Sequence, residues 1–406
     1  MNRLLLSLLF TLLASFVQAQ TSTELVRKAL MKQGNPEFDS CQVTLLPSAR
    51  EKYDDLFAHI RRAERFVHLE YFIFRLDSVG SELIHLLHEK AQEGVDIRLL
   101  LDAYGNWKAP TPITDKQVDS IRTLGIHMEI FDPARFPWIQ NMLHRDHRKI
   151  VVVDGRMAWT GGMNVADYYL HGTPKTGPWR DMQARFEGPV VNEFEKIFIR
   201  IWERTAKEHL DADAYKTDSL TYGNSVVTIV NREPRLSNRQ IRQSMIASLE
   251  SAKREVRIVN PYPTTTHSVR RAMKHALRRG IRLCIMVSAT SDNKIVPDVI
   301  AIQMKKMMKR GAEVYYFEGG FHHSKLMTVD DEFCSVGTAN LDGRSLRYDY
   351  EVNAFVFDST ITKQLNDLFD KDVKDSQILT PQSYKQRFSL KHRFVGRMFQ
   401  PLKGLL

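Results

Sequence analysis

The sequence predicts an α/β protein made of two similar lobes, and two observations lead to this prediction. Strand patterns alternate with helical patterns along the chain, which is typical of α/β layers. The second half of the chain also repeats the pattern of the first half. A length of 406 residues is enough for about two or three domains, and one lobe for each copy of the repeat fits within this range.

The composition excludes several classes of protein. With 43% hydrophobic and 26% charged residues, the chain is neither disordered nor collagen-like nor a small disulfide scaffold. A formal net charge of +10 favours phosphate-bearing partners such as anionic lipid, nucleic acid or a phosphorylated small molecule. The three cysteines are widely spaced, so no disulfide or metal framework is predicted.

Residues 1–19 are predicted to be a signal peptide or a short membrane anchor. Arg3 precedes an apolar run from Leu4 to Val17, and the small residue Ala19 suits cleavage after it. An uncleaved anchor and a buried first helix are the alternatives, although the run is short for a bilayer span. No later segment is long and apolar enough to span, so the mature chain is expected to be soluble or bound to a membrane surface.

The repeat begins with strands and helices in matching order. Each half has a strand, a helix that stops at a glycine, a strand, another glycine-stopped helix and a further strand. The predicted strands are 63–69, 95–101 and 126–130 in the first half and 252–258, 281–287 and 312–316 in the second; the glycines are Gly94, Gly125, Gly280 and Gly311.

The most informative part of the repeat is a set of four polar side chains. The first copy has His147, Lys149, Asp154 and Asn164, and the second has His323, Lys325, Asp330 and Asn340. Every pair is separated by the same 176 residues. The apolar runs 150–153 and 326–329 read as buried strands that end at the aspartates.

These side chains suit the chemistry of a phosphate ester. Residues i and i+2 of a strand share a face, so each lobe presents its His and Lys together. Lysine neutralises the phosphate, asparagine donates to it, and histidine can attack phosphorus or transfer a proton. One His can attack a phosphodiester while the other protonates the leaving alkoxide and then activates an incoming alcohol or water. No metal or cofactor is required.

The histidines have two other interpretations, a structural role and a metal-binding role. A single His beside a strand is often structural, but the second copy argues against that here. A metal site could use His144, His147, His322 and His323. It would leave the repeated lysines without a role.

The doubled His-x-Lys-x4-Asp motif with its following Asn resembles the phospholipase D superfamily, from about Cys41 to the C-terminus. Within it, the chain is most similar to bacterial cardiolipin synthases. The supporting motifs are Asn141 with 147–149, Gly161 to Asp167, Trp179-Arg180-Asp181, Gly337 to Asp342 with Arg344-Ser345, and Tyr350 to Asn353.

The resemblance implies two phospholipase D-like lobes, each a mixed β-sheet flanked by helices, related by a pseudo-twofold axis with the active site between them. It implies that two phosphatidylglycerol molecules become cardiolipin and glycerol through a phosphohistidine. The implied roles are His147 as nucleophile, His323 as acid/base, Lys149, Lys325, Asn164 and Asn340 as phosphate ligands, and Asp181 and Glu351 as acids that orient the histidines. Asp154 and Asp330 are counted with the catalytic set but are expected to brace the motif, and a solvated or structural role stays open for all four acids.

The predicted lobes are 20–215 and 216–385, followed by a basic amphipathic tail at 386–406. Two features depart from the family. The synthases commonly begin with two membrane-spanning helices, whereas this chain has one short apolar run. In the second half, Asn260-Pro-Tyr-Pro263 only partly matches the expected Pro-Tyr-Phe element.

The expected partners are phosphatidylglycerol and an anionic membrane surface. The insertion 131–139, which the second repeat lacks, could dip into lipid or pack on its own lobe, and the tail could lie on the membrane or dock on the second lobe.

The implied location is bacterial and exported or membrane-associated, at the periplasmic face of the cell membrane. The alternative function is a phospholipase D-type phosphodiesterase, either a lipid hydrolase or a nuclease, with water as acceptor. Nucleic acid is not expected because the basic residues are scattered. A non-catalytic adaptor should have lost a His or Lys, and none is lost.

Overall fold

A computed structural model of the chain describes residues 20–107, 112–133, 143–217 and 222–404. The predicted signal peptide or anchor, Asn141 and most of the insertion 131–139 lie outside the described residues. Among the described helices, none combines the length and the apolar character needed to cross a bilayer.

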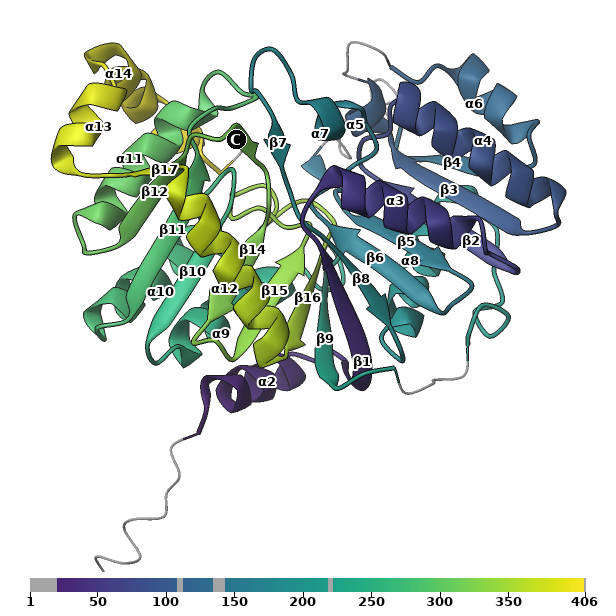
Figure 1. Cartoon of the computed structure of the whole chain (residues 1–406), viewed down its shortest axis with the longest axis horizontal. Helices are drawn as coiled ribbons and strands as arrows, with labels where there is room; N and C mark the ends of the chain where they lie inside the picture. Colours follow the sequence, from purple (N-terminus) through teal and green to yellow (C-terminus); the bar gives the residue numbers. More distant parts are fainter. Residues whose placement is uncertain (1–19, 108–111, 134–142, 218–221, 405–406) are drawn as a thin grey trace, which may run out of the picture.

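One continuous sheet of 15 strands runs through both halves of the molecule (Figure 1). Its order is β17-β12-β11-β10-β14-β15-β16-β9-β1-β8-β6-β5-β2-β3-β4. The first half contributes β1 (Glu37–Leu46), β2 (Phe66–Tyr71), β3 (Asp96–Asp102), β4 (His127–Phe131), β5 (Lys149–Val153), β6 (Met157–Gly161) and β8 (Gln183–Glu187). The second contributes β9 (Ser225–Arg232), β10 (Glu255–Val259), β11 (Arg282–Ser288), β12 (Glu313–Phe317), β14 (Leu326–Val329), β15 (Phe333–Gly337), β16 (Glu351–Phe357) and β17 (Ser376–Ile378).

The strand order is symmetric about the pair β1 and β9. Moving outward from this pair, β8, β6, β5, β2, β3 and β4 on one side match β16, β15, β14, β10, β11 and β12 on the other. In each half, parallel and antiparallel pairings are mixed. The prediction of two similar mixed α/β lobes is confirmed, and their sheets are joined edge to edge.

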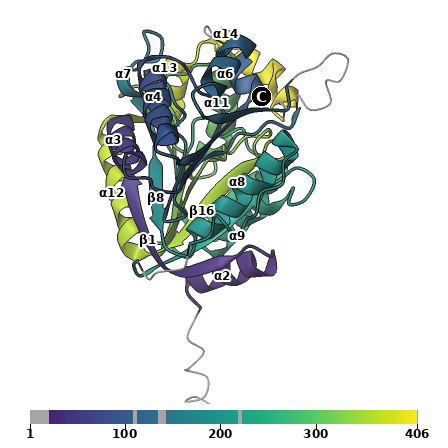
Figure 2. The ribbon, with the colours of Figure 1, turned by 90° about the vertical axis from the view of Figure 1, so that its right-hand side faces the viewer.

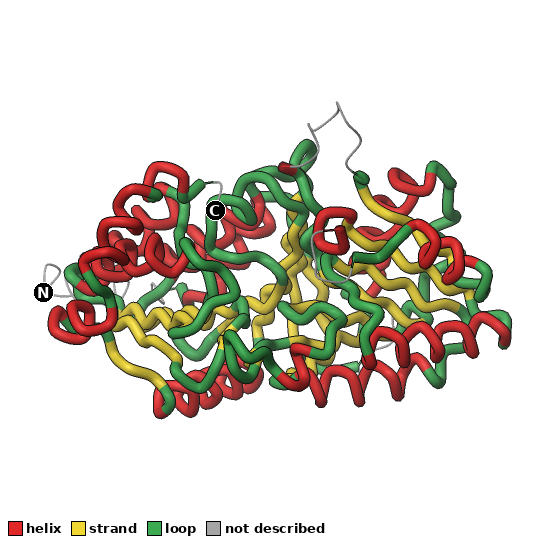
Figure 3. The backbone as a smooth tube through the Cα atoms, turned by 90° about the horizontal axis from the view of Figure 1, so that it is seen from above, coloured by secondary structure: helices red, strands yellow, loops and turns green. Residues whose placement is uncertain are grey.

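Helices cover both faces of the sheet (Figures 1, 2 and 3). The helices are α2 (Ser22–Lys32), α3 (Ala49–Ile60), α4 (Ser78–Gln92), α5 (Ala103–Trp107), α6 (Asp115–Arg122), α7 (Tyr168–His171), α8 (Val191–Ala206), α9 (Gln240–Ser251), α10 (His267–Arg278), α11 (Val296–Met308), α12 (Ser359–Lys374), α13 (Pro381–Arg387) and α14 (Leu390–Met398), with a final 3₁₀ turn at Gln400–Leu402. Helices α3 and α12 lie on one face, and α8 and α9 lie on the other (Figures 1 and 2). The equivalent helices α3 and α9 therefore cover opposite faces (Figure 2).

The glycine stop signals behave as predicted. Gly94, Gly280 and Gly311 follow α4, α10 and α11 and have φ angles of 90°, 82° and 95°. A side chain disfavours this left-handed conformation, so glycine ends the helix and turns the chain toward the next strand. The strands after these glycines begin within one residue of the predicted positions.

Helix α2 differs from the prediction. It falls in the range 20–215 assigned to the first lobe, but Val26 and Leu30 are buried in the core of the second lobe. The Ser22 hydroxyl donates to Asp330 at 2.5 Å, which fixes the helix there. An amphipathic helix pattern indicates a buried face but not the lobe that buries it.

The two lobes share a hydrophobic core where their sheets meet. This cluster includes Val152 and Phe186 from the first half and Val227 and Val352 from the second, all fully buried. The predicted lobe boundary, between residues 215 and 216, falls in the connection between α8 and β9.

Candidate active site

The two His-x-Lys pairs lie just before equivalent strands. Lys149 is the first residue of β5, and Lys325 directly precedes β14. In each pair the lysine Nζ donates to the backbone carbonyl of the histidine two residues earlier. Lys149, His323 and Lys325 are buried, and the His147 side chain is 13% exposed.

Each histidine is held by a carboxylate from the opposite lobe. Glu351 Oε1 lies 3.0 Å from His147 Nδ1, and Asp181 Oδ2 lies 2.7 Å from His323 Nδ1. Both carboxylates are buried. The structure thus brings together the predicted histidines and predicted acids, in a crossed arrangement that the sequence alone did not indicate.

Backbone hydrogen bonds between the lobes explain the crossed pairs. The His147 N–H donates to the Tyr350 carbonyl at 3.1 Å, and the His323 N–H donates to the Arg180 carbonyl at 2.7 Å. The second contact continues a short parallel pairing of β7 (Trp179–Arg180) with β13 (Phe321–His322). Each histidine therefore lies beside the residue that precedes the acid of the other lobe.

The residue beside each acid differs between the two lobes, and each one suits the length of its acid. The Thr338 hydroxyl donates to the second carboxylate oxygen of Glu351. The equivalent position in the first lobe is Gly162, where an added Cβ would lie 2.1 Å from Asp181 Oδ1. Threonine thus holds the longer acid, and the missing side chain of glycine leaves room for the shorter one.

Burial governs the titration of the site. Burial lowers the pKa of His147 to about 4, although Glu351 opposes the shift, and it also lowers the pKa of His323. Burial lowers the pKa of Lys149 to about 7 and that of Lys325 to about 8. With Nδ1–H directed at a carboxylate, a neutral imidazole carries its lone pair on Nε2.

Aromatic rings enclose the two imidazoles. The Phe72 ring lies 4.8 Å from the His147 ring, and the rings of Trp179 and Tyr262 lie 5.3 and 6.2 Å from that of His323. They contribute to the burial that lowers the pKa values of both histidines. Phe72 was missed by the sequence analysis, and its place immediately after β2 is the only signal that could have indicated it.

The two asparagines have different partners. The Ile73 N–H donates to Asn164 Oδ1 at 2.9 Å, and Asn164 Nδ2 donates to the Tyr169 hydroxyl at 3.0 Å. Lys52 Nζ and the Tyr53 hydroxyl, both from α3, donate to the backbone carbonyl of Asn164. In the second copy, Asn340 Oδ1 is buried without a hydrogen-bond partner in the part of the chain that the structure describes.

Asp154 and Asp330 lie outside the site, at the opposite ends of their strands. The Asp154 carboxylate accepts hydrogen bonds from the backbone N–H groups of residues 64–66, and Asp330 accepts them from residues 253–255. Because β5 separates His147 from Asp154 by the length of a strand, the aspartate cannot reach a substrate held by His147. Their inclusion in the catalytic set is therefore corrected to a bracing role.

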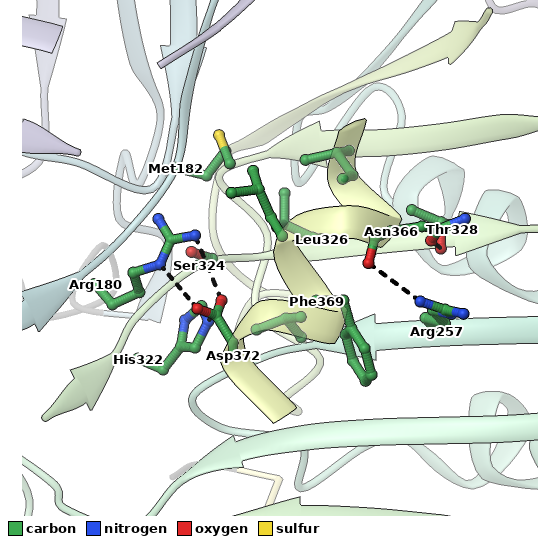
Figure 4. A pocket seen from close by; sticks show the side chains of 13 residues that line it. Arg180, Met182, Arg257, His322, Ser324, Leu326, Thr328, Asn366, Phe369 and Asp372 are labelled. Carbon is green, nitrogen blue, oxygen red and sulfur yellow. Dashed lines mark hydrogen bonds and ion pairs between the residues drawn. The ribbon is translucent and has the colours of Figure 1, made fainter. Parts of the chain in front are cut away.

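A further ion pair, beside His322, ties the lobes together (Figure 4). Asp372 from α12 lies 3.4 Å from Arg180 Nη2 and 3.1 Å from His322 Nε2. His144, the other histidine considered as a metal ligand, lies with Nδ1 2.8 Å from the Tyr348 carbonyl. The described residues contain no group of three His, Cys, Asp or Glu side chains that could hold a metal ion.

Known proteins are similar to this chain in sequence and in fold. Residues 56–202 and 245–373 match the family model described as "Cardiolipin synthase, PLD-like domain". Cardiolipin synthase 2 of Staphylococcus epidermidis is 34% identical over 90% of this chain and 74% of its own length. Cardiolipin synthase 1 of Staphylococcus aureus is 32% identical over 91% and 75% of the two chains, and the cardiolipin synthase of Geobacillus kaustophilus is 32% identical over 93% and 76%.

Solved structures support the fold. The phosphatidylserine synthase of Haemophilus influenzae superposes with a TM-score of 0.74 at 15% identity, over 94% of this chain and all of that one. The polyphosphate kinase of Porphyromonas gingivalis gives a TM-score of 0.55 at 12% identity, over 82% of this chain and 50% of that one. Together with the doubled motif and the crossed site, the family match shows that the chain belongs to the cardiolipin synthase family of the phospholipase D superfamily and is a phosphatidyltransferase of that superfamily.

Proposed function

We propose that the enzyme converts two phosphatidylglycerol molecules into cardiolipin and glycerol. The observation that carries this proposal is the crossed site, in which each carboxylate binds Nδ1 of a histidine and not the Nε2 that the reaction would use. Lys325 Nζ lies 3.1 Å from His323 Nε2. The substrate class is supported by three relatives named cardiolipin synthases that are 32–34% identical to this chain.

In the first step, His147 Nε2 attacks the phosphorus of one phosphatidylglycerol. The N–P bond forms as the bond from phosphorus to the glycerol headgroup oxygen breaks. His323, which must enter this step protonated, gives its Nε2 proton to the departing alkoxide, so that glycerol leaves and phosphatidyl-histidine remains. Asp181 favours this protonated form because a carboxylate at Nδ1 stabilises an imidazolium.

In the second step, His323 Nε2 takes the proton of a headgroup hydroxyl on a second phosphatidylglycerol. The resulting alkoxide attacks phosphorus, the N–P bond breaks, and cardiolipin leaves with His147 restored. Lys149 and Lys325 supply positive charge to the phosphate oxygens throughout, with Asn164 and Asn340 as candidate donors. Preorganised donors of this kind are each worth on the order of 10²–10³ in rate.

Lipid analysis by mass spectrometry tests the proposal. The enzyme and its His147→Ala variant are incubated with phosphatidylglycerol vesicles, and His171→Ala, which alters an exposed histidine, serves as the control. We expect cardiolipin and free glycerol from the wild type and the control but not from His147→Ala. Phosphatidic acid in place of cardiolipin would assign water as the acceptor, and unchanged lipid would overturn a lipid substrate.

We further propose that the enzyme works at a membrane surface, at the periplasmic face of a bacterial cell membrane, with residues 1–19 as export signal or anchor. The lipid substrate and the apolar N-terminal run support this location. Protease treatment of spheroplasts tests it, because a periplasmic enzyme is digested without lysis of the cells.

A further inference from the structure

Helix α14 carries an exposed apolar row. The side chains of Leu390, Phe394 and Met398 are 77%, 66% and 53% exposed, and Leu402 in the following turn is 49% exposed. At 3.6 residues per turn, the three helical positions lie within an arc of about 80°. Water-exposed apolar rows of this kind are uncommon unless they meet a partner.

The other face of α14 is fixed against α11. A Cβ added at Gly396 would lie 2.2 Å from the Asp298 carbonyl, so the two helices approach closely. His392 Nδ1 lies 3.3 Å from Asp298 Oδ1, and Gln400 Nε2 donates to the Val299 carbonyl at 2.9 Å. The tail therefore docks on the second lobe and still presents its apolar row outward.

Basic residues border the row and continue onto α11. Arg393 and Arg397 lie beside it on α14, and burial together with Lys309, Arg393, Arg397 and Lys385 lowers the pKa of Lys305. Burial, followed by Arg270, Lys306, Arg347 and Lys274, lowers the pKa of Lys403 to about 8. Positive charges thus repel one another across this surface, and an anionic partner would relieve the repulsion.

A cavity of about 520 Å³ opens beside the start of α14. Lys294, Arg387 and Lys391 line it, together with the hydroxyl residues Ser288, Thr290 and Ser291. Asp298 also lines it and is paired with His392. Apolar side chains such as Ile300, Phe388 and Val395 line the rest of the cavity. Its three cationic side chains, against one carboxylate, suit a phosphate headgroup.

We propose that α14 lies in the interface of an anionic lipid bilayer and docks the second lobe on it. Acyl chains would cover Leu390, Phe394 and Met398, while the neighbouring arginines and lysines reach the phosphates. A nucleic acid would leave the apolar row uncovered, and an apolar protein groove would leave the charges unmatched. Helix α14 lies at the same end of the molecule as α5, α7 and β7 (Figure 1), so docking there would bring the lobe interface close to the bilayer.

The proposed function explains why the enzyme would need to bind a membrane, and the docking proposal rests on it in this respect only. Binding of α14 to a bilayer requires no catalysis. A fluorescent NBD label at Met398→Cys reports insertion directly. The native cysteines Cys41, Cys284 and Cys334 are at most 1% exposed, so labelling is selective. Met31→Cys is the matched control, because Met31 is also 53% exposed and lies on α2 at the opposite end of the molecule (Figure 1).

Vesicles of phosphatidylcholine, with and without phosphatidic acid, are the probes. Phosphatidic acid is a phosphomonoester, so binding is measured without transfer. We expect a blue shift and several-fold brighter NBD emission at position 398 with the anionic vesicles only, and no change at position 31. The double variant Leu390→Ser/Phe394→Ser should weaken vesicle binding at least tenfold, whereas Leu25→Ser/Met31→Ser should leave it unchanged.

Four outcomes would overturn the proposal: no response at position 398, an equal response to neutral vesicles, a stronger response at position 31, or a blue shift already in buffer together with a dimer in sedimentation. The last outcome would assign the row to a second copy of the chain. If the label inserts but no cardiolipin forms from phosphatidylglycerol, docking stands and the proposed reaction fails.

Discussion

Each of the two histidines proposed as catalytic pairs with an acidic residue more than a hundred positions away in the sequence. Glu351 is separated from His147 by 204 residues, and Asp181 is separated from His323 by 142. A carboxylate at Nδ1 fixes the tautomer and the direction of Nε2. The doubled motif allowed the histidines and lysines to be predicted, and the family resemblance indicated the two acids, whereas no local pattern could show that the acids cross between the lobes.

Asp181→Asn and Glu351→Gln should each lower kcat by about 10²-fold, because the amide no longer stabilises an imidazolium. KM should change little, since neither acid binds the lipid in the proposed reaction. Glu195→Gln is the matched control, because Glu195 forms a buried 2.7 Å pair with His68 apart from the proposed chemistry. Steady-state rates on phosphatidylglycerol vesicles measure the effect, and a wild-type kcat for Asp181→Asn would remove the orienting role.

Anion binding should weaken as the pH rises. Because the pKa values of Lys149 and Lys325 are lowered to about 7 and about 8, both ammonium groups lose their protons near neutral pH instead of near 10. Sulfate keeps its charge over this range, so its affinity should fall roughly tenfold for each lost charge. Lys149→Arg stays charged and should remove the lower part of this pH dependence.

Calorimetric titration with sulfate between about pH 6 and pH 9 tests this prediction. Lys207→Arg, which alters an exposed lysine just after α8, should follow the wild-type curve. A wild-type affinity that is flat across the range would mean that both lysines stay protonated.

At the scale of elements, the start of each inner strand depends on an aspartate from a neighbouring turn. Asp154 caps the backbone that enters β2, and Asp330 does the same for β10. The His-x-Lys-x4-Asp spacing therefore combines two tasks: one end of the strand supplies the chemistry, and the other anchors the adjacent strand. Sequence spacing predicted that the aspartate follows the strand, and the structure shows which backbone N–H groups its carboxylate binds.

Asp154→Ala should lower the free energy of unfolding by about 1–3 kcal/mol, because three backbone donors lose their acceptor. The rate per folded molecule should stay near that of the wild type. Asp330→Ala should cost more, since Asp330 also binds Ser22 and thereby holds α2.

Urea unfolding and activity, measured on the same preparations, separate the two roles. Asp154→Asn is the companion variant, because asparagine tolerates the left-handed φ of 53° at this position. Loss of activity at an unchanged unfolding midpoint would return Asp154 to the catalytic machinery.

The local rules predicted the elements well and their assembly less completely. Glycines after α4, α10 and α11 and the buried runs of β5 and β14 are determined by neighbouring residues, so their bounds were nearly correct. The placement of α2 on the second lobe depends on contacts made 308 residues away, such as Ser22 with Asp330. The junction of the two sheets through β1 and β9 likewise joins strands from different copies of the repeat.

At the scale of the whole molecule, the joined sheets and shared core make the two lobes one structural unit. Val152 and Phe186 pack in the same cluster as Val227 and Val352, and Arg180 pairs with Asp372 across the interface. This coupling has a function in the proposed reaction, because a relative movement of the lobes would separate each histidine from its acid.

The coupling predicts that damage to one lobe unfolds the other. All five tryptophans lie in the first half, at positions 107, 138, 159, 179 and 202, so tryptophan fluorescence reports mainly on that half, and Trp179 also reports on the interface through its contact with Phe321. Leu283→Ala removes a fully buried side chain from β11 of the second lobe and should cost about 2–5 kcal/mol. We expect the fluorescence transition to move to lower urea together with the circular dichroism transition.

Leu99→Ala in β3 of the first lobe is the matched control and should shift both signals alike. A fluorescence midpoint that stays at the wild-type value for Leu283→Ala, with circular dichroism split into two transitions, would show that the lobes unfold independently.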